Sequence, residues 1–344
     1  MKKKILLLSG VVLAFVSATS QHSVDQRSVD QHTVGQHTAD QHSVDQHTVG
    51  QHTADEHSDG PGSLDSLRII SYNIWNGFDW GKDLDRLADF QHWMAAQDCD
   101  VAALQELCGY TPERLEEEAT EWRHSHTLLL KESGYSVGLS SKQPIELVER
   151  IRKGLHHGAL HCRTMGLDFL VVHLHPGSIE RRREEAKILE EKIRAIQSEG
   201  RSLVVLGDFN AHSPLDSTLY DPQGPLLTRL RESNKDKKGA SGNLEEGNLD
   251  YAVISTFLSL GLLDPVPDHA ATLEERGSFP AMALSDLNEE SQKHLWARLE
   301  RIDYILLSED LMRKCQSARV LNGKENWFLS DHYPVMADFI LNTP

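Results

Sequence analysis

Polar side chains that could hold a metal ion or move a proton stand at the ends of several apolar runs in this sequence. Asp208 and Asn210 follow the apolar run 203–207, and residues two apart on a strand point to the same side. An acid or a histidine inside or just after an apolar run is costly unless it is paired or used. The other residues placed in this way are Asn73, Glu106, His173, His175, Asp303, Ser330, Asp331 and His332.

The GDFN motif (207–210) is ambiguous when it is taken alone. A carboxylate and an amide on one side of a strand end could cap a turn, or they could hold a metal ion, a water molecule or a phosphate group. The same kind of placement recurs along the chain, however, and such repetition fits a purely structural role poorly. We therefore expect these side chains to form one chemical site.

The elements that must position this site follow from the hydrophobic pattern. Apolar runs typical of strands alternate with helical patterns, and some strands follow each other directly, which favours mixed sheets in an α/β protein. Residues 221–300 are the least regular part, with a charged loop at 231–247 and a short helical pattern at 250–260. We expect this region to face the substrate. The predicted strands are 67–74, 101–107, 134–141, 158–165, 167–175, 202–209, 301–308 and 333–341, and the clearest helices are 84–97 and 181–197.

Composition and charge narrow the classes of function. The chain has 344 residues, of which 39% are hydrophobic, enough for a sizeable core. Its formal net charge of −17 provides no global basic field that would attract nucleic acid. This charge does not exclude an enzyme that neutralises phosphate locally with a metal ion.

The N-terminal segment reads as an export signal followed by a spacer. Residues 1–20 combine three lysines, an apolar stretch and small residues, as in a signal peptide, and an uncleaved membrane anchor is the alternative. Residues 21–62 hold a polar, histidine-containing pentapeptide repeat and a linker, which we expect to be disordered. The repeat could bind metal, but we favour a spacer. The predicted folded domain is 63–344, and the expected location is secreted or periplasmic.

The four cysteines do not suggest a metal or redox centre, because no Cys-x-x-Cys pattern occurs. Cys99 and Cys108 flank a predicted strand and would lie too far apart to bond each other. Export permits other disulfide pairings, and these stay open.

Taken together, the motifs resemble those of a known enzyme family. SYNI, LQE, GDFN, RIDYI and SDHYPV occur in the family's order within residues 67–341 and are similar to patterns of the endonuclease/exonuclease/phosphatase family. These metal-dependent phosphoesterases include type-I deoxyribonucleases, abasic-site nucleases, neutral sphingomyelinases and inositol-polyphosphate phosphatases. The resemblance implies an α/β fold, a four-layered α/β/β/α sandwich of two mixed sheets with outer helices.

The resemblance also implies a metal centre. Glu106 would be the central ligand of Mg²⁺ or Mn²⁺, with Asn73 beside it and Asp331 completing or approaching the site. Hard oxygen ligands suit a magnesium ion that keeps its waters and binds a substrate phosphate.

The same resemblance implies roles for five catalytic residues. Asp208 would orient and help to deprotonate the attacking water, and Asn210 would hold that water or a phosphate oxygen. Asp303 would fix the tautomer of His332, which would stabilise charge on the transition state. His173 would contact a non-bridging oxygen or protonate the leaving group. The expected reaction is in-line attack of water on phosphorus without a covalent intermediate.

Several nearby residues have less specific patterns. His175, His212 and Ser330 could serve the site or could be only solvated or hydrogen-bonded. We expect His156 and His157 at the surface and one of Trp75 and Phe78 in the core. Arg181, Arg182 and Arg183 begin a helix and could reach a phosphate, but we favour a solvated helix face for them.

The sequence thus favours an exported, metal-dependent phosphoesterase that acts on a phosphodiester and is monomeric. The substrate could be a nucleic acid, a lipid headgroup or a small molecule, because the motifs that distinguish the family's branches are not matched. We expect no stable membrane insertion after signal cleavage. The alternatives are a phosphomonoesterase of the same fold, and a non-catalytic exported protein that binds a ligand or captures metal.

Overall fold

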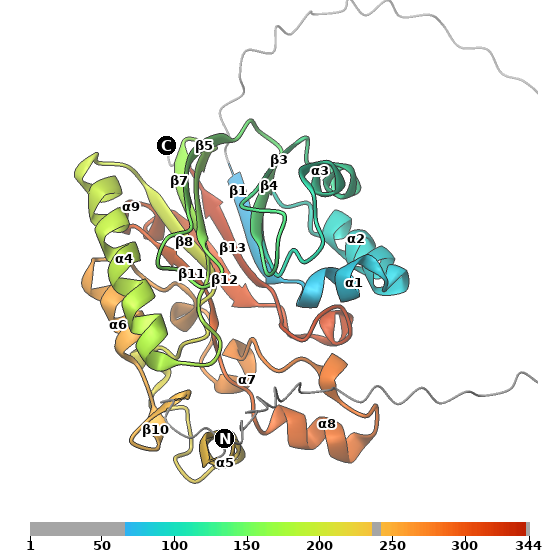
Figure 1. Cartoon of the computed structure of the whole chain (residues 1–344), viewed down its shortest axis with the longest axis vertical. Coiled ribbons are helices and arrows are strands. Elements are labelled where there is room, and N and C mark those ends of the chain that lie inside the picture. The colour runs from blue at the N-terminus through green and yellow to red at the C-terminus, as the bar shows by residue number, and fades with distance from the viewer. Residues whose placement is uncertain (1–65, 236–241, 342–344) are drawn as a thin grey trace, which may run out of the picture. The chain divides into compact units, whose positions relative to one another are not determined.

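The computed structural model describes residues 66–235 and 242–341, so the predicted signal peptide and repeat lie outside the described residues. The described residues belong to one compact unit. They form two packed sheets with helices outside (Figure 1), as the sequence predicted. Among them, no helix has the length and apolar character that a membrane crossing requires. All four cysteines are free thiols.

The first sheet has six strands in the order β12-β13-β1-β2-β4-β3, and the second has five in the order β11-β8-β7-β6-β5. The first sheet consists of β1 (Ser66–Asn73), β2 (Val101–Gln105), β3 (His126–Leu129), β4 (Val137–Ser141), β12 (Cys315–Val320) and β13 (Val335–Ile340). The second consists of β5 (Glu146–Ile151), β6 (Ala159–Thr164), β7 (Leu167–His173), β8 (Leu203–Asp208) and β11 (Asp303–Leu307).

Strand pairing brings the polar strand ends together. β1 pairs in parallel with β2, and β7 pairs in parallel with β8, whereas the other neighbours are antiparallel, so both sheets are mixed. His173 is the register partner of Asp208, and Asp208 is also the partner of Asp303. Because parallel strands end at the same edge, three predicted site residues become neighbours through backbone pairing alone.

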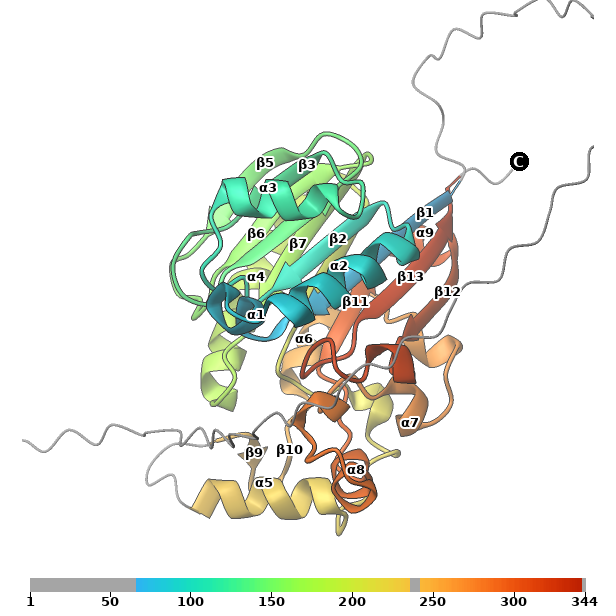
Figure 2. The same cartoon turned by 90° about the vertical axis from the view of Figure 1, so that its right-hand side faces the viewer.

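The layers follow from alternation along the strands. Ile69 and Val204 belong to the apolar cluster between the two sheets, whereas Ile70 and Val205 face outward under helices. Helices α2 (Leu84–Gln97) and α3 (Pro112–Thr120) cover the first sheet, and α4 (Ile179–Ser198) and α6 (Ala252–Ser259) cover the second (Figures 1 and 2). This is the predicted four-layered sandwich.

Three strands of the two large sheets were not predicted, and all three lie at sheet edges. β3 and β12 are the two edges of the first sheet, and β5 is an edge of the second. β5 is mostly exposed, and β12 alternates exposed and buried residues. An edge strand has a partner on only one side and carries polar residues, so its apolar signal is weak.

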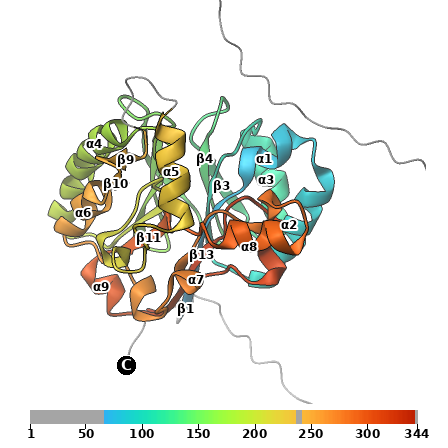
Figure 3. The same ribbon diagram turned by 90° about the horizontal axis from the view of Figure 1, so that it is seen from below.

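Residues 213–300 contain more helix than their sequence indicated. The predicted loop at 231–247 is wrong at its start, because α5 (Pro225–Lys235) extends into it as far as Lys235. Near its end, β9 (Leu244–Glu245) pairs with β10 (Asn248–Leu249). Figure 3 shows α5 and α8 together at one end of the sheets. Shorter elements are η1 (Pro214–Asp216), η2 (Val266–Asp268), α7 (Leu273–Arg276), η3 (Met282–Leu284), α8 (Glu289–Trp296), α9 (Glu309–Met312) and η4 (Lys324–Asn326).

The segment α1 (Trp75–Gly81) that follows β1 is wound left-handed. From Trp75 to Trp80, φ lies between +49° and +59°. This conformation costs about 1–2 kcal/mol for each L-residue with a Cβ atom, so tertiary contacts must hold it. Gly77 allows the segment to approach Cys108 closely, because a Cβ atom there would lie 2.4 Å from the Cys108 carbonyl oxygen. The strained turn thus lies against the chain that follows β2.

Candidate active site

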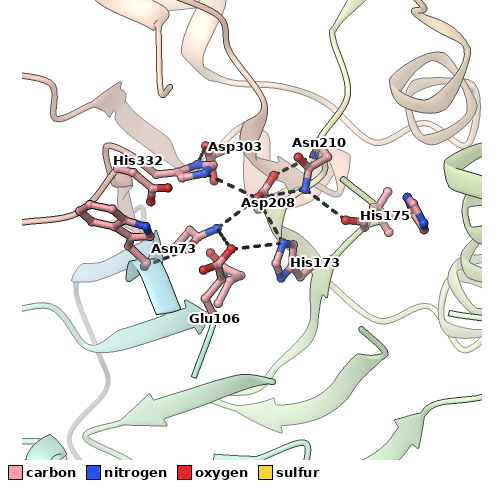
Figure 4. A network of polar contacts seen from close by, with 12 residues as sticks. Asn73, Glu106, His173, His175, Asp208, Asn210, Asp303 and His332 are labelled. Atoms are coloured by element: carbon pink, nitrogen blue, oxygen red, sulfur yellow. Dashed lines mark hydrogen bonds and ion pairs between the residues drawn. The ribbon is translucent and has the colours of Figure 1, made fainter. Parts of the chain in front are cut away.

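The predicted site residues converge at one edge of the two sheets (Figure 4). They come from the ends of β1, β2, β7 and β8, the start of β11 and the loop before β13. A cavity of about 450 Å³ opens over them. Its lining includes six of the eight predicted site residues, namely Glu106, His173, Asp208, Asn210, Asp331 and His332. The other two, Asn73 and Asp303, are hydrogen-bonded to Asp208 and His332.

Asp208 lies at the centre of this network and is 1% exposed. Its Oδ2 accepts hydrogen bonds from the Asn73 and Asn210 amides, both at 3.1 Å, and lies 3.4 Å from His173 Nε2. Its Oδ1 accepts the backbone N–H of Asn210 at 2.8 Å. Burial raises the pKa of Asp208, and the nearby carboxylate of Asp303 raises it further. The carboxyl is therefore fixed in direction, and its raised pKa makes the carboxylate a stronger base.

His332 and Asp303 form a buried pair, with His332 Nδ1 2.9 Å from Asp303 Oδ2. The Nδ1–H donates to the carboxylate, so the Nε2 edge remains directed toward Asp208, 3.9 Å away. Burial lowers the pKa of His332, but the carboxylates of Asp303 and Asp208 outweigh it and hold this pKa well above its usual value. His332 therefore carries a positive charge at neutral pH.

Glu106 and Asp331 bring two more acids to the cavity wall. Glu106 has φ +60° and accepts the backbone N–H of Asn76 at 2.7 Å, so the left-handed segment orients it. Burial raises the pKa of Asp331 to about 6, and the charge of Glu106 acts in the same direction. Asn73 directs its Nδ2 toward Glu106 Oε1 at 3.4 Å and toward Asp208. These crowded oxygens form a hard donor set that fits Mg²⁺ or Mn²⁺.

A different group of three side chains has possible ligand atoms that lie close to one another. Among the described residues, Asp208, Asp303 and His332 form the one group of three possible ligands whose atoms lie within 4.8 Å of one another. We do not assign the cation there, because Asp303 is already bonded to His332 and a protonated His332 would repel it. Glu106 and Asp331 fit a cation better, because Glu106 holds only long or backbone contacts on its carboxylate.

His173 differs from His332 in its protonation. Burial lowers its pKa well below the usual value, and the charges of His157 and His332 lower it further. The ring of His157 stacks on His173 with centroids 4.1 Å apart. His157 is 6% exposed, so its predicted surface position is wrong. The ring of His173 covers His157, and the sequence around His157 does not reveal this distant neighbour. His156 is exposed as predicted.

The remaining predicted residues fall into supporting positions. Ser330 is buried and donates to the Asn73 carbonyl at 2.6 Å, and His212 is 2.9 Å from the buried Glu300. Phe78 lies in the core, whereas Trp75 lines the cavity. His175 is half-buried.

The arginines at the start of α4 do not all lie on a solvated face. Arg181 is exposed, but Arg182 is 2% exposed, and that part of the prediction is wrong. Its guanidinium is buried because it donates to the His175 carbonyl at 2.8 Å and to Asn243 at 3.0 Å.

Sequence reasoning missed four residues of the site. Asn76, Tyr135 and Phe279 line the cavity, and Glu300 holds His212. Asn76 follows directly after the SYNIW motif, so its position was a usable signal. Tyr135 and Phe279 lie in segments whose sequences show no polar strand end, and nothing local marked them.

Comparison with a family model matches residues 70–332 of the chain to the endonuclease/exonuclease/phosphatase family. This range includes Asn73 to His332 and therefore every residue of the site described above. No curated protein sequence is significantly similar to the chain.

Solved structures share the fold. An AP endonuclease from Archaeoglobus fulgidus matches with a TM-score of 0.58 and 18% identity, covering 79% of this chain and 99% of its own. The 3′-5′ exonuclease NExo from Neisseria meningitidis matches with a TM-score of 0.56 and 21% identity over 79% and 99% of the two chains. NExo, there described as a 3′ phosphatase, is also known bound to a product DNA hairpin, with a TM-score of 0.55, 21% identity and the same coverage.

Proposed function

The chain belongs to the endonuclease/exonuclease/phosphatase family and is a phosphoesterase of that family, and from this premise we propose that it hydrolyses a phosphodiester by in-line attack of water. The observation that carries the proposal is the grouping of Asp208, the Asp303–His332 pair, His173 and Glu106 around one cavity. A binding protein with a decayed site would have lost some of these groups.

In the proposed mechanism, the Asp208 carboxylate accepts a hydrogen bond from the attacking water and takes its proton. The Asn73 and Asn210 amides fix the direction of that carboxylate. The positively charged His332 donates to a phosphate oxygen as negative charge develops there. Neutral His173 contacts a non-bridging oxygen, and the leaving group takes its proton from solvent, because a neutral imidazole does not release its N–H proton. A bound Mg²⁺ or Mn²⁺, held by Glu106 and Asp331 with Asn73 beside them, would supply positive charge opposite the phosphate.

The test is hydrolysis of bis-p-nitrophenyl phosphate and p-nitrophenyl phosphate with Mg²⁺, with Mn²⁺ and with EDTA. We expect metal-dependent turnover that favours the diester and falls about 10³-fold or more in Glu106→Ala and His332→Ala, since each removes a group that acts on developing charge. The exposed residues Glu121 and His294 provide matched controls as Glu121→Ala and His294→Ala.

The outcomes separate the competing hypotheses. Preference for the monoester would make the protein a phosphomonoesterase of the same fold. Turnover that survives EDTA or the Glu106→Ala change would refute the proposed metal centre. A folded protein that hydrolyses neither ester, nor oligonucleotides or lipid headgroup diesters, would favour the binding hypothesis.

We further propose that the protein is exported, with residues 1–20 as signal peptide, residues 21–62 as spacer and linker, and residues 63–344 as a monomeric enzyme. The support is the sequence of the N-terminal segment. Mass spectrometry of protein from the medium and the periplasm should find an N-terminus near residue 20. Deleting residues 21–60 should leave hydrolysis and the metal content unchanged, whereas loss of bound metal with intact hydrolysis would assign metal capture to the repeat.

A further inference from the structure

A second cavity of about 380 Å³ adjoins the one over Asp208, and His156 lines both. Its other charged or polar lining residues are His175, Arg181 and Glu185. The chain as a whole has a formal net charge of −17, and this wall carries one arginine, two imidazoles and one glutamate. Figure 4 shows the His175 ring turned away from Asp208, on the far side of Asn210. None of the proposed catalytic steps uses these residues.

Glu185, from α4, holds the two histidine-bearing segments together. Its Oε1 accepts the backbone N–H of His156 at 2.5 Å, and its Oε2 accepts that of His175 at 2.8 Å. The buried Arg182 fixes the same turn by donating to the His175 carbonyl. The two imidazole rings consequently lie with centroids 4.3 Å apart. Because both oxygens of Glu185 are occupied by backbone donors, its charge is already engaged inside the wall.

One imidazole N–H of this wall is free to donate, and a second imidazole nitrogen without a partner lies at the adjoining cavity. Gly177 N–H donates to His175 Nδ1 at 3.0 Å, so a neutral His175 carries its proton on Nε2. His157 is 6% exposed and lines the first cavity, and its buried Nε2 has no hydrogen-bond partner among the described residues. An unpaired buried polar atom beside a cavity is a reason to expect a ligand.

The long side chains of Arg181 and Lys131 carry positive charges that acidic groups offset only weakly. Arg181 is 69% exposed at its side chain, and its ion pair with Glu184 is long, at 3.4 Å. The Lys131 ammonium has no ion-pair or hydrogen-bond partner within residues 66–235 and 242–341. Burial lowers the pKa of His156, and the charges of Lys131 and Arg181 lower it further, so both cations act at this histidine. Arg181 and Lys131 are therefore the positive charges that an anion near this wall would meet.

We infer that this second cavity, lined by His156, His175 and Arg181 with Lys131 nearby, binds a second phosphate group of the substrate. The inference rests on the proposed function for the position of the reacting phosphate. It narrows the substrate class to esters that carry at least two phosphates, such as neighbouring phosphates of a nucleic acid or a phosphorylated inositol headgroup. Arginine, lysine and imidazole N–H donors are the groups that recognise phosphate.

The first test compares pairs of diesters that differ only in a second phosphate, using the full chain with Mg²⁺. Thymidine 5′-(4-nitrophenyl phosphate) is compared with the same compound bearing a 3′-phosphate, and glycerophosphoinositol with its 4-phosphate. We expect the second phosphate to lower KM about 10-fold in at least one pair, which corresponds to one good charge-assisted contact. An effect in the nucleotide pair alone assigns a nucleic-acid source, and one in the inositol pair alone assigns a headgroup source.

Substitutions test whether the residues that line the second cavity cause the effect of the second phosphate. In Arg181→Gln and His156→Gln, the ratio of kcat/KM between the two members of the pair should fall toward one. Arg194→Gln is the matched control, because Arg194 is another exposed arginine of α4 that pairs with a neighbouring glutamate. If the ratio is already near one in the unaltered protein while both substrates turn over, the second-phosphate site is refuted and the phosphodiesterase function remains.

A binding measurement keeps the inference testable without turnover. Calorimetry in EDTA should show that thymidine 3′,5′-bisphosphate binds about 10-fold more tightly than thymidine 5′-monophosphate, and that Arg181→Gln removes the difference. If this result accompanies a failure to hydrolyse any ester, the proposed function fails but the phosphate site stands. Equal affinity for the two nucleotides overturns the site whatever the turnover.

Discussion

Asp208 and His332 show how one acid and one histidine can be adjusted in opposite ways by burial. Both are almost inaccessible to solvent. Burial and the charge of Asp303 raise the pKa of Asp208, which makes its carboxylate a stronger proton acceptor. Burial alone would lower the pKa of His332, but the adjacent carboxylates hold it high. A proton acceptor, Asp208, and a fixed cation, His332, thus lie within a few ångströms of each other. This arrangement depends on Asp303, because Asp303 bonds His332 directly.

Changing Asp303→Asn should therefore reduce kcat about 10³-fold or more with little change in KM. The amide removes the charge that keeps His332 protonated and can present the wrong hydrogen-bonding group to Nδ1. Steady-state kinetics on the diester would measure the effect, with Asp286→Asn on an exposed loop as the control. An Asp303→Asn enzyme within about 3-fold of the unaltered kcat would remove the pair from the mechanism.

Asp168 supplies a residue-scale prediction about stability rather than catalysis. Its carboxylate is fully buried and bonded to His161 at 2.7 Å, to Arg163 at 3.0 Å and to Arg201. Burial raises its pKa, but these three donors outweigh burial and hold the pKa below the usual value. The unfolded chain, with an ordinary pKa of about 3.9, therefore takes up a proton more readily than the folded protein does. The stabilisation is complete above about pH 4 and is lost as the pH falls below it.

Urea unfolding at pH 6.5 should show Asp168→Asn to be about 1.5–3 kcal/mol less stable than the unaltered protein, because the buried His161 and the half-buried Arg163 and Arg201 lose their charged partner. At pH 3 the difference should narrow. An equal difference at both pH values would mean that the pKa of Asp168 is the same in the folded and unfolded states.

At the scale of elements, the left-handed segment α1 is the least expected feature of the fold. It comes directly after Asn73, and the backbone N–H of Asn76 within it holds Glu106. Arg86, from α2, fixes the segment by donating to the carbonyls of Ile74 and Trp75. Backbone strain is usually retained at functional sites, and this strained segment holds Glu106, the carboxylate proposed to bind the metal ion.

Gly77→Ala tests this element. A methyl group at φ +56° would meet the Cys108 carbonyl at 2.4 Å, so we expect a loss of at least about 2 kcal/mol and a fall in activity as Glu106 is displaced. Gly134→Ala is a sharp control, because Gly134 has φ +64° but nothing within 4 Å of the added atom. It should lose only about 1 kcal/mol and keep its activity. Equal losses in the two variants would mean that the contact with Cys108 contributes nothing.

At the scale of the whole molecule, the apolar core lies apart from the proposed metal centre. One apolar cluster joins the two sheets, and two others join each sheet to its helices. The acids of the site lie at one edge of these layers rather than inside them. The core therefore supplies a rigid frame, and the site adds little to its stability.

EDTA should accordingly abolish turnover while leaving the circular dichroism spectrum intact and lowering Tm by only a few degrees, as expected for one bound cation. Addition of Mg²⁺ or Mn²⁺ should restore the activity. Cooperative unfolding on chelation would show instead that the metal is part of the folding core.

The amino-acid sequence by itself determined the central strands, the outer helices 84–97 and 181–197, and the polar residues at strand ends. These features are local: a strand buried on both faces is apolar throughout, and an acid at its end stands out. The sequence was also enough to predict that Asp208, His173 and Asp303 share one site, because the motifs of the chain occur in the order found in a known family.

Only the tertiary structure decided the edge strands, the left-handed segment, the burial of His157 and Arg182, and the second cavity. Each depends on a partner distant in the chain: β5 on β6, Gly77 on Cys108, His157 on His173, and the His156–His175 pair on Glu185. Sequence patterns record which face of an element is apolar but not which element covers it. The fold could therefore be predicted from local periodicity, whereas the charge pattern that selects a substrate arose only when distant segments met.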